Sequence, residues 1–353
     1  MSQFSRQVLH WFDLHGRKDL PWQLNPSAYR VWVSEIMLQQ TQVTTVIPYF
    51  QRFMTQFPQV NVLAEAPLDQ VLHLWTGLGY YARARNLHKA AQQLMQEYAG
   101  EFPSTTAQWV KLPGIGISTA GAIVALAFDQ PAAILDGNVK RVLTRHFAIA
   151  GWPEQRPVND RLWNIAQEIL PVSRFADYTQ AMMDLGALVC TRSMPNCPDC
   201  PVKKTCRARA QQTIADYPGR KSGRTLPVRQ VTMYILQNRE GEVLLMKRPP
   251  TGIWGGLWSF PESPVDIVDI EGSAGSRWSE EINTGTTLPM VRHSFTHFHL
   301  HITPVLTQVG NSIDAVAEPS DRIWYAVHRP ARIGLAAPVK KLLEQIANRP
   351  PTP

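Results

Sequence analysis

The sequence predicts two domains, an all-α domain followed by a smaller α+β domain, and two patterns along the chain support this. Up to about residue 210 apolar residues recur at helical spacing, as at Phe4, Val8 and Phe12. From Val228 the pattern changes to short strand-like runs, "VTMYILQ" and "EVLLMKR", joined by the turn residues "NREGE". A length of 353 residues, of which 44% are hydrophobic, is sufficient for two cores.

Composition places the expected boundaries. We expect a helical domain over residues 1–210, a basic linker over 211–227, an α+β domain over 228–347 and a disordered tail over 348–353. The segment "IADYPGRKSGRTLP" mixes glycine, proline, serine and basic residues, as exposed connectors do. The N-terminus shows no signal segment, and no apolar run of about 20 residues occurs, so we expect a cytoplasmic protein.

One short loop holds all four cysteines, with the spacing C-x6-C-x2-C-x5-C. Clustered thiols in a cytoplasmic protein favour a metal over disulfides. Four sulfur ligands suit zinc or an iron–sulfur cluster. Structural zinc usually takes two close pairs of ligands, and only Cys197 and Cys200 form one, so we favour iron and sulfur and leave zinc open. The four candidate ligands are Cys190, Cys197, Cys200 and Cys206.

Basic side chains gather directly after the cysteines. Residues 201–230 contain eight lysines and arginines and one aspartate, a net charge of +7 that equals the charge of the whole chain. Such a segment suggests a polyanion partner, because neutralised phosphates release counterions. A solvated linker is the alternative.

Two glycines flank Ile115 in "LPGIGISTAGAIVALAF". Gly114 and Gly116 permit a tight hairpin between helices, and the free N–H groups at the start of the second helix can face a phosphate oxygen. An ordinary corner between helices explains the same pattern.

Two carboxyl groups stand where acid–base chemistry is possible. Asp136 ends an apolar run and precedes a helical pattern, which predicts an N-cap whose pKa is lowered by backbone N–H groups and the helix dipole. Glu35 lies among apolar residues; pointing inward it would have a raised pKa and carry a proton, and pointing outward it would be solvated. A proton donor opposite an ionised carboxylate is the pairing that breaks glycosidic bonds. Together with the hairpin and the basic segment, this pair suggests an enzyme acting on the N-glycosidic bond in DNA.

The sequence also resembles a known family. The stretches "LPW", "VWVSEIMLQQTQV", "GLGYYARARNL", "LPGIGISTAGAI", "LDGNVKRV" and "MDLGALVC", followed by the cysteine loop, are similar to adenine DNA glycosylases of the MutY type, in the helix-hairpin-helix superfamily. The resemblance implies an enzyme that flips adenine, mispaired with 8-oxoguanine or guanine, out of duplex DNA and cuts it from its sugar. We expect a monomer, because nothing in the sequence argues otherwise. It also implies a 4Fe-4S cluster on the four cysteines, which shapes their loop so that neighbouring basic side chains meet the DNA backbone.

The resemblance assigns roles to individual residues. Glu35 would protonate the adenine ring, Asp136 would stabilise the oxocarbenium-like sugar, directly or through a covalent intermediate, and Asn138 would support both, although helix capping also explains Asn138. Ser118 stands where strand-cleaving relatives place a Schiff-base lysine, which implies base removal without efficient strand cleavage. Lys140, one helical turn after Asp136, is expected to contact a phosphate, with capture of the abasic sugar as the alternative.

Further residues match positions in the family that contact DNA or adenine. Gln39 and Tyr80 would wedge into the base stack, although Tyr80 also suits simple packing. The glycines of the hairpin and Ser118 would contact the DNA backbone. The residues matching the adenine pocket are Trp22, Gln23, Leu38 and Asp184.

The second domain resembles the nucleotide-pyrophosphohydrolase fold called Nudix. The spacing from Gly256 to Glu262 survives, but a metal-binding helix after it does not, and "RWSEEI" at Arg277 is a poor remnant, so we expect no hydrolase activity. The resemblance implies that Phe295-Thr296-His297 matches a Phe-Ser-His loop that probes oxidised guanine. The alternating residues His293, Phe295, His297, His299 and His301 are expected to share one strand face, where a metal site is an alternative.

Two other functions stay open at the level of sequence. A bifunctional glycosylase and strand-cleaving lyase for damaged pyrimidines would need an amine at position 118. A DNA-binding or iron–sulfur redox sensor without catalysis gives no reason for an acid at Glu35.

Overall fold

The computed structural model describes residues 1–221, 223, 225–262, 285–309 and 321–349. It forms two compact units. The first, here called the helical unit, comprises Met1–Glu65 and Asn86–Gly223, and the second, the sheet unit, comprises Ala66–Arg85 and Arg224–Pro353. Among the described residues, none of the helices combines the length and apolarity needed to cross a bilayer.

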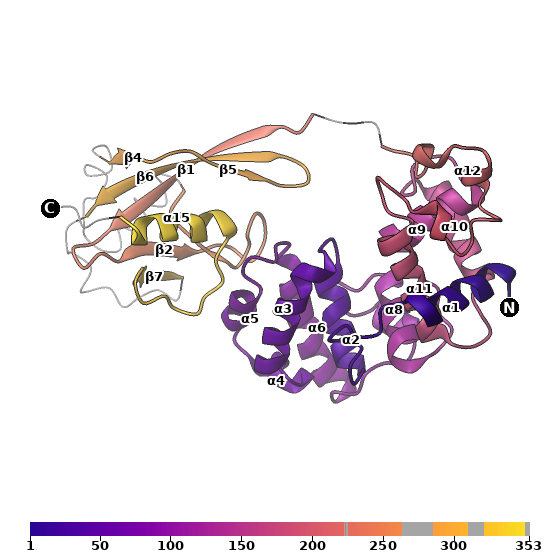
Figure 1. Cartoon of the computed structure of the whole chain (residues 1–353). Coiled ribbons are helices and arrows are strands. Elements are labelled where there is room, and N and C mark those ends of the chain that lie inside the picture. The colour runs from indigo at the N-terminus through magenta and orange to yellow at the C-terminus, as the bar shows by residue number, and fades with distance from the viewer. Residues whose placement is uncertain (222, 224, 263–284, 310–320, 350–353) are drawn as a thin grey trace. The chain divides into compact units, whose positions relative to one another are not determined.

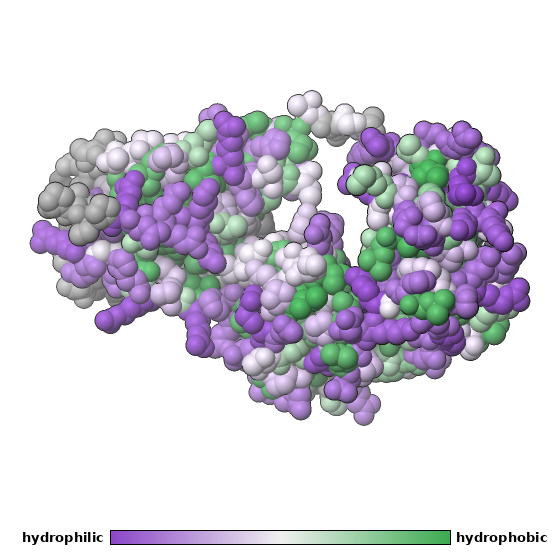
Figure 2. Space-filling view, viewed as in Figure 1, coloured by the Kyte–Doolittle hydropathy of each residue, from purple (hydrophilic) through white to green (hydrophobic). Residues whose placement is uncertain are grey.

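The helical unit consists of helices joined by short loops (Figure 1). Its helices are α1 (Gln3–His15), α2 (Ala28–Leu38), α3 (Val43–Gln56), α4 (Val60–Glu65), most of α6 (Ala82–Tyr98), α7 (Thr106–Trp109), α8 (Ile117–Phe128), α9 (Gly137–Phe147), α10 (Arg156–Glu168), α11 (Phe175–Asp184) and α12 (Arg207–Ala210). A π-helical turn, η1 (Leu185–Val189), continues α11, and two 3-10 turns follow, η2 (Cys197–Asp199) and η3 (Ile214–Asp216). Hydrophilic side chains cover much of the face of this unit seen in Figure 2.

The predicted first helix is confirmed. Ser2 caps α1 by accepting a hydrogen bond from the backbone N–H of Ser5 at 3.1 Å. Phe4, Val8 and Phe12 are buried and share one core cluster with residues of α9, α10 and α11. The 3.6-residue period of apolar side chains therefore identified both the helix and its buried face.

Close packing of α8 sets the position of the chain that enters α9. A Cβ atom on Gly121 would lie 2.3 Å from the carbonyl oxygen of Ala133, so only glycine allows this approach. The backbone N–H of Leu135 donates to the hydroxyl of Ser118 at 2.9 Å. Residues 132–135 are thereby held against α8, and Asp136 follows directly.

The sheet unit is a mixed sheet covered by helix α15 (Ala337–Ala347) (Figure 1). Its strands are β1 (Val228–Gln237), β2 (Val243–Lys247), β3 (Trp258–Ser259), β4 (Thr286–Thr287), β5 (Val291–Ser294), β6 (His299–Gln308) and β7 (Arg322–Tyr325). The strand order is β3-β2-β1-β6-β4, with β5 also on β6 and β7 on β2. Strands β1 and β6 run parallel, and β1 and β2 form the predicted antiparallel hairpin with Gln237 opposite Val243.

One segment of the N-terminal half packs with the sheet unit. Helix α5 (Leu68–Leu74) and the loop after it belong to Ala66–Arg85, a segment that helical spacing predicts to be part of one continuous helical domain. The Tyr81 hydroxyl donates to the carbonyl of Leu335 at 2.8 Å, and Lys247 pairs with Asp69 at 2.9 Å. Helical spacing predicts that a segment has a buried face, but not which core covers it.

The first half of the predicted linker contacts the helical unit, although several of its residues are exposed. Arg145 donates through Nε to the carbonyl of Tyr217 at 3.0 Å, and the Lys221 ammonium lies 5.0 Å from the centre of the Trp152 ring. These contacts fasten the segment to the helical unit. The remnant beginning at Arg277 and residues 350–353 of the predicted tail lie outside the described residues.

Candidate active site

Glu35 lies on α2, whose neighbouring side chains Trp32, Ile36 and Met37 are buried. Ser27 caps the helix by accepting from the backbone N–H of Arg30. Burial and the negative charge of Asp136 raise the pKa of Glu35 to about 8. The sequence left the orientation of Glu35 open, and the structure favours the inward one, in which the raised pKa keeps a proton on the side chain at neutral pH.

Asp136 is the N-cap of α9, as predicted. Its carboxylate accepts from the backbone N–H of Val139 at 2.8 Å and from the side-chain amide of Asn138 at 3.4 Å. The expected lowering of its pKa is wrong in direction, because burial raises the pKa of Asp136 more than its hydrogen bonds and the charge of Arg141 lower it. The sequence predicted that Asp136 caps α9, but it did not predict that the side chain is buried.

The two carboxyl groups are electrostatic neighbours, since the charge of Asp136 contributes to the raised pKa of Glu35. Backbone and amide hydrogen bonds and the charge of Arg141 favour the ionised form of Asp136. Burial and the charge of Asp136 both favour the protonated form of Glu35. When the pair shares one proton, Glu35 holds it and Asp136 is the anion.

Asn138 links this pair to the turn after α11. Its side-chain oxygen accepts from Arg141 at 2.8 Å, and the same guanidinium donates to the carbonyls of Gly186 at 2.6 Å and Cys190 at 2.7 Å. A Cβ on Gly186 would lie 2.5 Å from the Cβ of Asn138, so η1 packs against the first turn of α9. Asn138 therefore serves as a bridge and not only as a helix-start residue.

The predicted hairpin precedes α8. Gly114 has φ +77°, a conformation that favours glycine, and a Cβ there would lie 2.7 Å from Asn86. Gly116 is the N-cap of α8, with open space where its Cβ would be. The amide of Gln39, at the end of α2, donates to the hydroxyl of Thr119 at 3.3 Å, so it is placed beside the start of α8.

Lys140 forms an ion pair with Glu154 at 2.8 Å, and its side chain is 15% exposed. The sequence offered a phosphate or the abasic sugar as the partner of this amine. In the structure the partner is a carboxylate on the loop between α9 and α10, which sequence reading did not identify.

The four residues assigned to the adenine pocket fall into two groups. Trp22 is buried with its ring against Phe50, and Leu38 is half-buried at the end of α2. Gln23 and Asp184 are engaged with the chain itself. Gln23 donates to the carbonyl of Arg17 at 3.0 Å, and the buried carboxylate of Asp184 accepts from the backbone N–H and Nε of Arg17 at 2.7 and 2.9 Å. Contact of all four residues with adenine stays a prediction.

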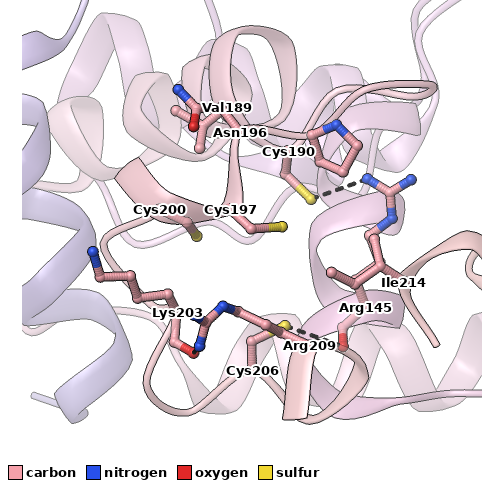
Figure 3. A pocket seen from close by; sticks show the side chains of 11 residues that line it. Arg145, Val189, Cys190, Asn196, Cys197, Cys200, Lys203, Cys206, Arg209 and Ile214 are labelled. Atoms are coloured by element: carbon pink, nitrogen blue, oxygen red, sulfur yellow. Dashed lines mark hydrogen bonds between the residues drawn. The ribbon is translucent and has the colours of Figure 1, made fainter. Parts of the chain in front are cut away.

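The four cysteine side chains line one hollow, together with Arg145, Asn196 and Lys203 (Figure 3). Arg145 donates to the Cys190 sulfur at 3.4 Å and to the carbonyl of Thr191 at 2.7 Å, which fixes the start of the loop. Across the described residues, no three Cys, His, Asp or Glu side chains are arranged to hold a metal ion.

Four thiols that line one hollow are a donor set that suits either zinc or an iron–sulfur cluster. The residues present therefore fit the expected 4Fe-4S cluster by their chemistry, and the choice between iron and zinc stays a prediction.

In the sheet unit, the predicted single strand from His293 to His301 is wrong. Strand β5 ends at Ser294 and β6 begins at His299, and the backbone N–H of Phe295 donates to the carbonyl of Phe298 at 2.9 Å. Residues 295–298 form a hairpin loop, because antiparallel pairing of β5 with β6 reverses the chain. The alternating histidines therefore do not share one strand face.

The loop 295–298 presents polar groups to solvent on an aromatic base. Thr296 and His297 are exposed, and the Phe295 ring stacks on the buried Phe298 ring at 4.5 Å. Trp254, from the loop before β3, lies 5.6 Å from the Phe295 ring. Tyr80 also belongs to this unit and is 48% exposed.

Glu262, at the end of the Nudix-like spacing, forms an ion pair with Arg248. The absence of hydrolase activity stays a prediction.

Known proteins similar to this chain match both units. Residues 33–168 match the model of the HhH-GPD superfamily of base excision DNA repair proteins, and residues 232–345 match that of the NUDIX domain. The adenine DNA glycosylase of Buchnera aphidicola subsp. Acyrthosiphon pisum is 41% identical over 97% of this chain and 97% of its own. The chain belongs to the adenine DNA glycosylase family. The mouse family member, from Mus musculus, is 38% identical over 97% of this chain and 77% of its own.

Two solved structures resemble part of this chain in fold. A thermostable thymine-DNA glycosylase superposes with a TM-score of 0.54 at 27% identity, over 59% of this chain and 95% of its own. An endonuclease III–DNA complex has a TM-score of 0.51 at 23% identity, over 59% of this chain and 94% of its own, and shares the fold. The expected fold classes, helix-hairpin-helix and Nudix-like, are confirmed.

Sequence reading missed the residues that position the site. Arg17 was not singled out, and it reaches Asp184 across 167 positions of sequence. Arg141 and Arg145 appeared only as members of a helical pattern. Their signal was weak: two arginines one turn apart near an N-cap carboxylate, which more often form a solvated face.

Proposed function

We propose that this adenine DNA glycosylase removes adenine paired with 8-oxoguanine or guanine from duplex DNA and leaves an abasic site without efficient strand cleavage. The observation that carries the proposal is the pair of neighbouring carboxyl groups: the pKa of Glu35 is raised to about 8, and Asp136 accepts hydrogen bonds from Val139 and Asn138 that favour its ionised form. Membership of the family gives the substrate base.

In the proposed reaction adenine is extruded from the duplex and enters between the two carboxyl groups. Glu35 donates its proton to a ring nitrogen, and the bond from C1′ of the sugar to N9 breaks with its electron pair going to the purine. Asp136 stabilises the positive charge that develops on the sugar. Water then adds to C1′ and gives a proton to the Glu35 carboxylate, which yields the abasic sugar and restores the acid.

Hydrolysis without efficient strand cleavage is supported by Ser118. Its hydroxyl accepts from the backbone N–H of Leu135 and offers no amine for a Schiff base. The other nearby amine, on Lys140, is paired with Glu154. Both observations favour release of adenine alone.

Recognition of the base opposite adenine is proposed for the exposed tip of the hairpin β5–β6. Thr296 and His297 offer a hydroxyl and an imidazole at the surface, supported by the Phe295 ring. These groups can hydrogen-bond the additional carbonyl and N–H of an oxidised guanine.

The cysteine loop is proposed to hold a 4Fe-4S cluster on Cys190, Cys197, Cys200 and Cys206. Bound there, the cluster would fix the fold of the loop through four iron–sulfur bonds. Lys204 and Arg207 are exposed beside it and suit contacts with DNA phosphates. We further propose that the protein acts as a monomer in the cytoplasm, associated with DNA.

The test uses a duplex with one adenine opposite 8-oxoguanine. Free adenine and strand breaks are measured after incubation, before and after hot alkali. Free adenine with breaks that require alkali supports the proposal. Breaks without alkali would indicate a lyase, and no base release from any duplex would indicate a DNA-binding sensor.

A further inference from the structure

Tyr80 has a backbone conformation that its surroundings must maintain. It lies in the left-handed region with φ +49°, directly after Gly79 at φ +76°, and its side chain is 48% exposed. Such a conformation is uncommon for residues other than glycine and persists only where neighbouring contacts enforce it.

Two side chains of the same unit enforce this turn. The indole N–H of Trp75 and the guanidinium of Arg83 both donate to the carbonyl of Gly79 at 3.1 Å. Arg83 is 9% exposed and lies 5.5 Å from the ring centres of Trp75 and Tyr80. The buried guanidinium of Arg83 therefore supports the exposed ring of Tyr80 by a cation–π contact.

Tyr81 fastens this turn to the rest of the sheet unit. Its hydroxyl donates to the carbonyl of Leu335 at 2.8 Å and accepts from the backbone N–H of Gly77 at 3.3 Å. Tyr81 is 7% exposed, and Leu335 pairs with Trp258 of β3. One hydroxyl therefore joins the turn that carries Tyr80 to the fold that carries Phe295–His297.

We propose that Tyr81 is a positioning residue for the Tyr80 wedge and couples it to the loop Phe295–His297 through the sheet unit. The proposal rests on the proposed function and on the expectation, from the family resemblance, that Tyr80 enters the base stack. Tyr80 and the loop Phe295–His297 both belong to the sheet unit. Contacts of the loop with the base opposite adenine therefore also hold Tyr80 in place.

The test is Tyr81→Phe, which removes one oxygen and keeps the ring. The single-turnover rate of adenine release opposite 8-oxoguanine should fall about 2- to 12-fold, as expected for one hydrogen bond. A 2-aminopurine next to the target adenine, whose fluorescence rises on unstacking, should brighten less on binding.

The matched control is Tyr29→Phe. The hydroxyl of Tyr29 makes the same kind of buried bond, to the carbonyl of Phe57 at 2.9 Å, within the helical unit. This control should lower the thermal midpoint as Tyr81→Phe does, and leave unstacking and adenine release unchanged.

A second background shows whether Tyr81 acts through Tyr80. In the Tyr80→Ala background, adding Tyr81→Phe should not lower the rate of adenine release further, because Tyr81 acts through Tyr80. An effect of Tyr81→Phe that persists in full in that background, or that equals the effect of Tyr29→Phe, overturns the inference. Wild-type protein that releases no adenine refutes the proposed function itself.

Discussion

Glu35 and Asp136 respond to the same burial with different outcomes. Both pKa values are raised, and only Asp136 has a backbone N–H, an amide and a nearby guanidinium that oppose the shift. In the proposed reaction, this difference separates a proton donor from an anion without a large difference in solvent exposure.

The rate of adenine release should depend on the proton of Glu35. With a pKa of about 8, the single-turnover rate should fall as the pH rises above that value, because the donor is lost. Glu35→Gln should have little activity at every pH. A wild-type rate that stays constant well above pH 8 would show that another group supplies the proton.

The same shift predicts how stability depends on pH. The folded protein keeps a proton on Glu35 between the ordinary pKa of 4.5 and about 8, whereas the unfolded chain releases it. The free energy of unfolding therefore decreases as the pH rises through this window. In Glu35→Gln this part of the decrease should disappear, as measured by urea unfolding at both ends of the window.

Both acids could be singled out from the sequence, whereas the direction of the pKa shift of Asp136 could not, and their roles in catalysis stay predictions. The apolar run around Glu35 was compatible with a buried or a solvated side chain, and the structure favours the buried one. The sequence predicts that Asp136 is a cap because capping is local, but the burial that raises its pKa depends on the tertiary fold. The sequence therefore predicted the hydrogen bonds that lower the pKa of Asp136, but not the burial that raises it.

At the scale of elements, η1 can pack against the first turn of α9 only because residue 186 is a glycine and has no side chain. Gly186→Ala places a methyl group 2.5 Å from the Cβ of Asn138, so α9 and η1 must separate. We expect the free energy of unfolding to decrease by about 1–3 kcal/mol and adenine release to slow.

Gly137→Ala is the control for this change. Nothing lies within 4 Å of the Cβ that it adds, in the same turn of α9, so stability should change by less than about 0.5 kcal/mol. Equal stability of the two variants would contradict the packing described for Gly186.

The cysteine loop gives a separate prediction at this scale. Purified protein should show the broad visible absorbance of an iron–sulfur centre, and Cys200→Ser should lower both the colour and the iron content. Colourless protein containing one zinc per chain would contradict the assignment, because zinc has no such absorbance.

Element types were predictable where their period was long and regular. The 3.6-residue period of apolar side chains predicted α1 and α9, and the turn residues "NREGE" predicted the hairpin β1–β2. The alternating pattern of residues 293–301 gave the wrong prediction of a single strand, because a tight turn interrupts these residues although their pattern continues through it. A period of two cannot distinguish one strand from a hairpin with a short loop.

At the scale of the whole molecule, the net charge comes from one segment. The logarithm of the DNA binding constant should fall linearly with the logarithm of salt concentration. In Lys204→Ala with Arg207→Ala, the slope should decrease by about 0.9 for each DNA phosphate that the variant no longer neutralises. Arg156→Ala removes an exposed cation outside the segment and should leave the slope unchanged.

The division of the chain was less predictable than its folds. The strand pattern after Val228 indicated the second fold, but Ala66–Arg85 joins it through contacts such as that between Tyr81 and Leu335. A pattern along the sequence contains no information about a partner more than 250 residues away.

Asp136→Asn tests the account most directly, because asparagine also caps helices and differs from aspartate here mainly in charge. Adenine release in a single turnover and binding to the same mismatch would be measured side by side. The account predicts unchanged binding and no release. Release at the wild-type rate would contradict the role given to the Asp136 anion.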